Sequence, residues 1–421
     1  MESASKPKQT LFTPLKELAF RRLFIGQVLS DFGNWLDFTA LAVLVVYTWG
    51  LGVEAVASLM FTMSISWVLL GPFLSVWVDR LPRRSMMIAS ALLRAAVVGS
   101  MIFVPNLYVL LPLVFFKGVL GAVNYPARQS AIRELVPEPL IPQAVALNQI
   151  SFRVTQIVAP SLGGGIIALS GPRSVFAVEV FVLVLAGLFF LGLPRLAGEG
   201  AEASKERNFW AEFREGFQHI AARRQLSVAI TLISVGFFIV FLYDGLLTVW
   251  TKEMALGEAS YGLLLAAMGL GNVIGAVAAG QWTFWRNTPF QMMAGMAVLA
   301  GLINLVIGMS GFGYFDWPLA VWLGVFLVFG IVGAASTVPF GYILQAETPQ
   351  HLMGRVSAVS GSIQNGAVLG APAAGALLAN LMGLGGVFLL AGVLMVTLAL
   401  LVLLFLPRIV ATHDSKQAEV A

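Results

Sequence analysis

The chain has 421 residues, of which 58% are hydrophobic and only 11% are charged. Soluble domains need a polar surface and usually contain about 25% charged residues. This composition therefore excludes an ordinary soluble protein and indicates that lipid surrounds most of the chain. The chain contains no cysteine, which excludes disulfides, thiolate metal sites and a cysteine nucleophile.

The first 20 residues lack an apolar core followed by a small-residue cleavage site, so we expect a cytoplasmic N-terminal segment at 1–20 rather than a cleaved signal. After it come continuous apolar runs of about 20 residues, the length of a membrane-crossing helix. A β-barrel would instead show ~10-residue segments of alternating polarity. Twelve helical spans are predicted: 21–49, 55–78, 85–104, 107–127, 142–170, 173–194, 226–251, 259–283, 289–310, 318–345, 355–381 and 386–407.

A polar stretch at 195–225 is the longest in the chain and separates the first six spans from the last six. We interpret it as a cytoplasmic linker between an N-terminal bundle at 21–194 and a C-terminal bundle at 226–407, which a cytoplasmic tail at 408–421 follows. Apolar residues recur at helical intervals in its second part: Phe209, Phe213, Phe217 and Ile220. This spacing predicts an interfacial amphipathic helix.

Positive charges are distributed unevenly over the predicted loops. With a cytoplasmic N-terminus, nearly all lysines and arginines outside the spans fall on the cytoplasmic side, and only Arg173 and Lys252 fall on the other side. This asymmetry orients membrane proteins. We therefore expect a multi-pass protein of the inner (plasma) membrane with both termini in the cytoplasm.

The two halves also resemble one another. Three pairs of residues share one separation and align the fifth span with the eleventh: Pro137 with Pro349, Pro160 with Pro372, and Gly163 with Gly375. At a similar separation, Asp37 of the first span corresponds to Asp244 of the seventh. Six-plus-six repeats around a central site are typical of alternating-access carriers.

Between the second and third spans the chain reads VDRLPRRSMM (78–87). This stretch resembles the signature of the major facilitator superfamily, a glycine followed by Asp-Arg and a basic pair, with a serine in the place of the glycine. The resemblance implies a conformational latch that holds one access state, and orientation of the hairpin is an alternative role for its basic pair. The latch residues are Ser75, Asp79, Arg80, Arg83 and Arg84, with Glu134 and Arg355 as candidate neighbours.

Two further stretches narrow the resemblance. The first, APSLGG (159–164), is similar to a Gly-Pro run of drug antiporters, with alanine in the place of its first glycine. The second is NYPARQSAIRELVP (124–137) followed by ALNQ (146–149). It resembles the macrolide-efflux and siderophore-exporter branch of drug:proton antiporters. Bacterial lysophospholipid carriers are a more distant likeness. The resemblance implies an all-α polytopic membrane protein with twelve transmembrane helices in two pseudo-symmetric six-helix bundles, the major facilitator fold.

Several ionisable residues fall inside the predicted spans. An unpaired charge at the bilayer midplane costs at least ~2.5 kcal/mol on insertion scales, so these groups should pair or line a hydrated cavity. We expect them to couple transport to protons, and static ion pairs that fasten helices are the alternative. The residues are Asp31, Asp37, Arg94, Lys117, Arg153, Glu179 and Asp244.

Uncharged polar and aromatic side chains in the spans form a candidate substrate site. The residues are Asn34, Trp35, Phe38, Asn124, Tyr125, Gln149, Gln156, Phe237, Phe241, Tyr342, Gln345, Gln364 and Asn365. A cavity that is charged on one side and apolar on the other suits an amphiphilic or lipophilic cation or zwitterion.

The leading hypothesis is a proton-coupled exporter of amphipathic small molecules. Transport of lysophospholipid or another lipid is the alternative. An enzyme is disfavoured because the three histidines, His219, His351 and His413, fall in cytoplasmic segments and no metal-ligand cluster or P-loop is present. We expect a monomer whose partners are substrate, protons and membrane lipid, without cofactor, metal or nucleic acid.

Overall fold

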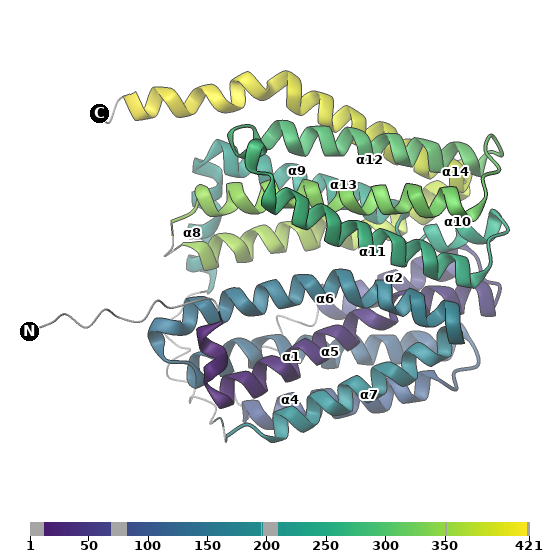
Figure 1. Ribbon diagram of the computed structural model, residues 1–421, viewed down its shortest axis with the longest axis horizontal. Helices are drawn as coiled ribbons and strands as arrows, with labels where there is room; N and C mark the ends of the chain where they lie inside the picture. Colours follow the sequence, from purple (N-terminus) through teal and green to yellow (C-terminus); the bar gives the residue numbers. More distant parts are fainter. Residues whose placement is uncertain (1–11, 69–81, 195, 197–208, 350–351, 419–421) are drawn as a thin grey trace, which may run out of the picture. The chain divides into compact units, whose positions relative to one another are not determined.

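The computed structural model describes residues 12–68, 82–194, 196, 209–349 and 352–418, which form helices joined by short turns (Figure 1). Nine helices in these ranges are long and apolar enough to cross a membrane. The last of them, Arg355–Phe405, contains Gly383 with φ 76° and ψ 167°, between the spans predicted at 355–381 and 386–407. The all-α membrane fold is thus confirmed. The count of twelve spans stays a prediction, because part of the second span lies outside the described residues.

The chain divides into two compact units. Unit 1 comprises residues 1–41, 65–166 and 170–204. Its helices are most of α1 (Leu18–Val43), with α4 (Arg83–Met101), α5 (Leu107–Leu135), α6 (Ile141–Ser170) and α7 (Pro172–Leu191), and its short 3-10 turns are η1 (Thr13–Lys16) and η3 (Glu138–Leu140). Helix α4 packs against both α5 and α7.

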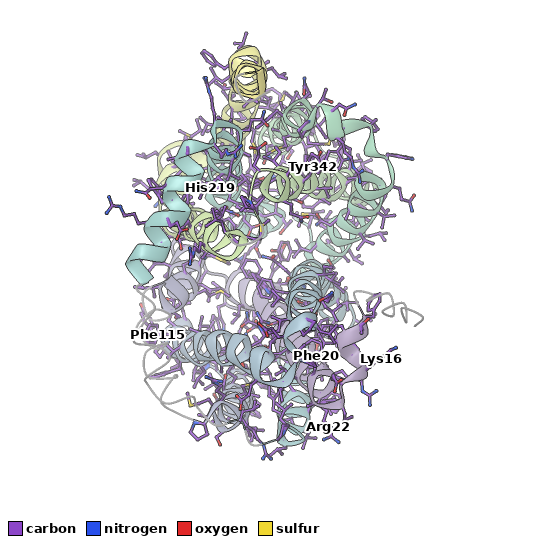
Figure 2. All side chains as sticks on the ribbon, turned by 90° about the vertical axis from the view of Figure 1, so that its left-hand side faces the viewer. Lys16, Phe20, Arg22, Phe115, His219 and Tyr342 are labelled. Carbon is purple, nitrogen blue, oxygen red and sulfur yellow. The ribbon has the colours of Figure 1, made fainter. Side chains whose placement is uncertain are left out.

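Local sequence explains where the helices of unit 1 begin. Asn106 caps α5, because its side-chain oxygen accepts a hydrogen bond from the backbone N–H of Val109 at 3.2 Å. Helix α7 begins at Pro172, whose fixed φ suits the first helical position, directly after Gly171 with φ 78°. Near the start of α1, Phe20 is fully buried in an apolar cluster with Met87 (Figure 2).

Unit 2 comprises residues 42–64, 167–169 and 205–421. It holds the π-helical turn η2 (Leu44–Thr48), most of α2 (Val53–Val68), α8 (Phe209–Ala222), α9 (Arg224–Tyr243), α10 (Leu247–Glu253), α11 (Glu258–Gln281), η4 (Thr283–Asn287), α12 (Pro289–Gly311), α13 (Leu319–Ala346) and α14 (Met353–Ala418). Helix α11 packs against α13, and α14 packs against both α9 and α12.

Helix α8, in the predicted linker, is amphipathic and docks on unit 2. Ile220 is only 4% exposed and lies in an apolar cluster with Val356 and Val359 of α14, whereas Phe217 is 52% exposed. The Nε2 atom of His219 lies 3.0 Å from the carbonyl oxygen of Glu347 (Figure 2). These contacts attach the linker helix to the C-terminal half of the chain.

The predicted internal repeat has a packing counterpart. A Cβ atom added at Gly163 of α6 would lie 2.6 Å from the carbonyl oxygen of Leu36 in α1. At the equivalent Gly375 of α14, an added Cβ would collide with the carbonyl oxygen of Leu242 in α9. In both units, therefore, a glycine allows two helix backbones to approach closely.

Candidate functional site

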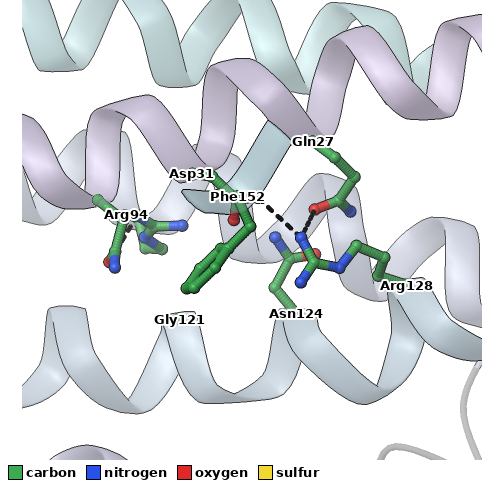
Figure 3. Close-up of a pocket in the computed structure, with 8 residues that line it drawn as sticks. Gln27, Asp31, Arg94, Gly121, Asn124, Arg128 and Phe152 are labelled. Carbon is green, nitrogen blue, oxygen red and sulfur yellow. Dashed lines mark hydrogen bonds and ion pairs between the residues drawn. The ribbon is translucent and has the colours of Figure 1, made fainter. Parts of the chain in front are cut away.

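A pocket inside unit 1 is lined by residues from four helices (Figure 3). Helix α1 contributes polar residues at helical spacing, α4 contributes an arginine, α5 contributes two polar residues and a glycine, and α6 contributes an aromatic ring. The lining residues are Gln27, Asp31, Asn34, Arg94, Gly121, Asn124, Arg128 and Phe152. Four of them, Asp31, Asn34, Arg94 and Asn124, belong to the sites predicted from the sequence.

Asp31 pairs with an arginine that was not among the predicted site residues. Its Oδ2 atom lies 2.7 Å from Nη1 of Arg128, whose side chain is only 5% exposed. The guanidinium carbon of Arg128 also lies 5.9 Å from the ring centroid of Phe152, close enough for a cation–π contact. Hydropathy ended the fourth span at 127 and left Arg128 in a loop. In the structure, α5 continues to Leu135, so Arg128 is a buried helical residue.

Arg94 is 2% exposed, and among the described residues its guanidinium donates to neutral acceptors. Nη1 donates to Ser30 Oγ at 3.1 Å, and Nη2 donates to Asn34 Oδ1 at 3.2 Å. Its Nε has no hydrogen-bond partner among the described residues. Asn124 holds Ser30 from the other side, because its Nδ2 donates to the same hydroxyl at 3.1 Å. Arg94 is thus a buried cation held by amide and hydroxyl groups.

A second charged cluster, also inside unit 1, joins α5 to α1 and α7. The ammonium of Lys117 lies 2.9 Å from Glu179 Oε1 and pairs with Asp37 Oδ2 as well. Both carboxylate side chains are 0% exposed, and none of their oxygens accepts a well-aligned hydrogen bond from the described residues. The structure therefore brings together three of the predicted coupling residues in one buried triad.

Asp244 and Arg153 are the remaining predicted coupling residues. Asp244 follows the last residue of α9 in unit 2, with Tyr243 immediately before it. The Tyr243 hydroxyl accepts a hydrogen bond from Nδ2 of the buried Asn304 at 3.3 Å. The side chain of Arg153 lies outside the described residues.

Among the predicted substrate residues of unit 1, Trp35 lies beside the pocket. Its ring centroid is 6.3 Å from that of Phe152 and 6.5 Å from that of Phe38. Gln156 is partly buried on α6. The side chains of Tyr125 and Gln149 lie outside the described residues.

Six of the predicted substrate residues belong to unit 2. Phe237 and Phe241 are partly buried on α9. Tyr342 is 40% exposed and its ring packs edge-on against Trp285 at 5.6 Å (Figure 2). Gln364 donates hydrogen bonds to Ser360 on its own helix, and Gln345 and Asn365 are exposed, so the substrate roles of all six stay predictions.

Three of the predicted latch residues, Ser75, Asp79 and Arg80, lie outside the described residues. The others form contacts inside their own units. In unit 1, Arg83 pairs with Glu134 at 3.0 Å, and Arg84 donates to the carbonyl oxygen of Leu191 at 2.7 Å. In unit 2, Arg355 pairs with Glu215 of α8. The latch itself stays a prediction.

Four lining residues were missed by sequence reasoning: Gln27, Arg128, Phe152 and Gly121. A usable signal existed for the first two. Gln27, Asp31 and Asn34 recur at i, i+4 and i+7, and Asn124 and Arg128 recur at i, i+4, so each set lies on one face of its helix. No comparable signal marked Phe152, because single aromatic residues are common on apolar helices.

The sequence profile of the Major Facilitator Superfamily matches residues 23–371. The uncharacterized MFS-type transporter YfiS of Bacillus subtilis (strain 168) is 26% identical over 390 residues, which cover 91% of this chain and 92% of that protein. Macrolide efflux protein A of Streptococcus pyogenes is 24% identical over 350 residues, which cover 80% and 83% of the two chains.

Solved structures show the same fold. The crystal structure of a POT family transporter in complex with a thioalcohol conjugated peptide superposes with a TM-score of 0.70 at 13% sequence identity. The match covers 93% of this chain and 96% of that chain. The resemblance to the macrolide-efflux branch is confirmed by the relative from Streptococcus pyogenes. Since the profile spans well over half of the chain, the protein belongs to the Major Facilitator Superfamily, a multi-pass membrane transporter with efflux proteins among its relatives.

Proposed function

We propose that this transporter exports amphipathic or lipophilic small molecules across the inner membrane by alternating access, and that protons drive it. An efflux relative supports the direction of transport. The observation that carries the proton coupling is the buried triad of Asp37, Lys117 and Glu179. In the proposed orientation, both termini lie in the cytoplasm.

Charge balance explains why this triad suits proton coupling. Two carboxylates share one ammonium, so the triad carries an excess negative charge when all three groups are ionised. Burial of an uncompensated charge is costly, and one proton on either carboxylate removes the excess. Since Lys117 approaches both acids, it can stabilise whichever one stays ionised. Binding and release of that proton on opposite sides of the membrane would link transport to the proton gradient.

The test measures transport in proteoliposomes with an imposed pH gradient. A labelled macrolide reports substrate movement, and a trapped pH-sensitive dye reports proton movement. In Asp37→Asn and Glu179→Gln, the triad is neutral without a bound proton, because one carboxylate remains for Lys117. We therefore expect gradient-driven macrolide transport, and the proton flux that accompanies it, to be at least tenfold slower in both variants than in the unchanged protein.

Glu138→Gln is the matched control, since Glu138 is an exposed acid in the short turn η3 of the same unit. This variant should transport like the unchanged protein. Undiminished gradient-driven transport in both triad variants would exclude the triad as the proton site. Macrolide transport without any proton flux in the unchanged protein would exclude proton coupling altogether.

Transport of a lysophospholipid or another lipid is the second candidate function. Two arginines that line the unit 1 pocket, Arg94 and Arg128, favour lipid transport, because guanidinium groups suit a charged head group. Parallel assays with a labelled macrolide and a labelled lysophospholipid, each in vesicles with and without the protein, distinguish the two functions. Movement of the lysophospholipid alone would select the second candidate.

A further inference from the structure

The pocket of unit 1 contains more positive than negative charge. Two guanidinium groups, those of Arg94 and Arg128, line it together with a single carboxylate, that of Asp31 (Figure 3). Asp31 already pairs with Arg128 at 2.7 Å. If the pocket were built for a cationic head group, the excess charge would have the opposite sign.

Arg94 is the cation without a close counterion. Among the described side chains, no carboxylate lies within ion-pair distance of its guanidinium, since Lys117 holds both Asp37 and Glu179. Asp31 in turn pairs with Arg128. A buried guanidinium normally has an ion partner. An anion in the pocket would supply it.

Unused hydrogen-bond donors point to the same class of ligand. Gln27 is 1% exposed and lines the pocket, and its Nε2 has no hydrogen-bond partner among the described residues. The Nε atom of Arg94 is also without one. An unsatisfied buried donor lowers stability by about 1–3 kcal/mol. A ligand whose oxygens accept hydrogen bonds from these donors would remove that penalty. Asn124 Oδ1 is an unsatisfied acceptor on the same wall, which allows a hydroxyl or amide next to the anionic group.

The shape of the pocket limits what enters it. Its volume is about 20 Å³, far below that of a site that encloses a drug-sized molecule. Only the charged end of a head group can enter a space of that size, and the rest of a substrate would lie outside it. The ring of Phe152, with Trp35 edge-on behind it at 6.3 Å, offers an apolar surface beside the charges.

We infer that this pocket binds the anionic head group, a carboxylate or a phosphate, of an amphipathic substrate, with Arg94 as its main ion partner. Arg128 and Gln27 supply further donors, and the apolar body of the substrate packs on Phe152. This inference rests on the proposed transport function and names the substrate class that it takes. The class differs from the cation or zwitterion that the sequence suggested.

The test measures equilibrium binding to the purified protein in phosphatidylcholine nanodiscs. Four probes share one planar body and differ in the head group: naphthoate, naphthyl phosphate, trimethylnaphthylammonium and naphthamide. We expect the two anions to bind at least tenfold more tightly than the ammonium and the amide. Tighter binding of the ammonium, or equal binding of all four, would overturn the inference.

Variants identify the site. Arg94→Gln should weaken binding of both anions at least tenfold, and Arg173→Gln, at an exposed arginine of the same unit, should leave it unchanged. Since Arg94→Gln removes buried hydrogen bonds and can impair folding, Asp31→Asn provides a second test. Asp31 carries the one carboxylate among the described lining residues, so anion binding should become several-fold tighter without it. Weaker anion binding in a folded Asp31→Asn variant would contradict the assignment.

Competition distinguishes a lipid from a soluble anion. Lysophosphatidate added to the nanodiscs should displace naphthyl phosphate if the phosphate of a lipid is the natural head group. If it does not, the head group belongs to a soluble amphiphile. These binding assays require neither a pH gradient nor turnover. They can therefore show no preference for anions while the transport assay shows proton-coupled export, or show that preference while the transport assay shows no proton coupling.

Discussion

At the scale of single residues, Lys117 is the cation that pairs with the buried carboxylates of Asp37 and Glu179 in unit 1. It compensates two carboxylates that are 0% exposed, and its own side chain is 6% exposed. Removal of one partner from a buried ion pair typically costs 3–5 kcal/mol, because the other charge stays buried. Here, removal of Lys117 would leave two buried carboxylates, those of Asp37 and Glu179, without their cation.

We therefore predict that Lys117→Gln lowers the free energy of unfolding by about 3–5 kcal/mol. Thermal unfolding of the purified protein in detergent measures this loss. The second change Asp37→Asn should recover part of it, because only Glu179 then remains and can take up a proton. Arg173→Gln, at an exposed position, should change the unfolding temperature little. Additive losses in the double variant would show that the two groups do not interact.

At the scale of helices, close packing at equivalent glycines holds together the pairs α1 with α6 and α9 with α14. The carbonyl oxygens of Leu36 and Leu242 lie where a side chain at Gly163 or Gly375 would begin. Protein interiors have little free space, so helices must separate to admit a methyl group there. The agreement between the two units also gives the sequence repeat a physical reason.

Gly163→Ala and Gly375→Ala should each destabilise the protein, by roughly 1–3 kcal/mol, as overpacked core substitutions do. Gly165→Ala is the matched control, since Gly165 lies two residues further along α6 and an added Cβ there meets no described atom within 4 Å. That control should be neutral or slightly stabilising, because alanine favours a helix more than glycine. Unfolding temperatures of the three variants, compared in one detergent, measure the difference. Equal temperatures for Gly163→Ala and Gly165→Ala would refute the packing argument.

At the scale of the whole molecule, unit 2 contains a contact between distant parts of the chain. Residues 42–64, from the first two helices, pack there with the segment around α10. The hydroxyl of Tyr47 lies 2.8 Å from Thr251 Oγ1, and Lys252 donates to the carbonyl oxygen of Val46 at 2.7 Å. Val56 approaches Gly245, where an added Cβ would lie 3.1 Å from Val56 Cγ1. If transport proceeds as proposed above, this contact lies on the outer side and opens for release of the substrate.

A disulfide at this contact should stop transport. The chain has no cysteine of its own, and an added Cβ at Gly245 would lie 3.1 Å from Cγ1 of Val56, so cysteine side chains at these two positions can approach one another. We expect the transport rate of the double variant Val56→Cys/Gly245→Cys to fall at least tenfold when the protein is oxidised and to recover when it is reduced. Each single variant controls for the substitution itself. Full transport by the oxidised protein would contradict opening at this contact.

Much of the fold was predictable from the sequence. Apolar run length and charge asymmetry act locally along the chain, so they predicted a helical membrane protein and most of the spans. The break at Gly383 falls between two predicted spans. The resemblance of short motifs also predicted the superfamily, which the family profile confirms.

Only the tertiary structure decided how the buried charges are shared. Helical spacing predicts which residues lie on one face, but it cannot show which other helix faces them. Lys117 takes both Asp37 and Glu179, and Asp31 pairs with Arg128, a residue that hydropathy had left in a loop. The sequence showed that charges are placed in the spans, where lipid does not solvate them. Which of them pair, and that Arg94 meets an amide and a hydroxyl instead of a carboxylate among the described residues, followed from the packing of the helices in three dimensions.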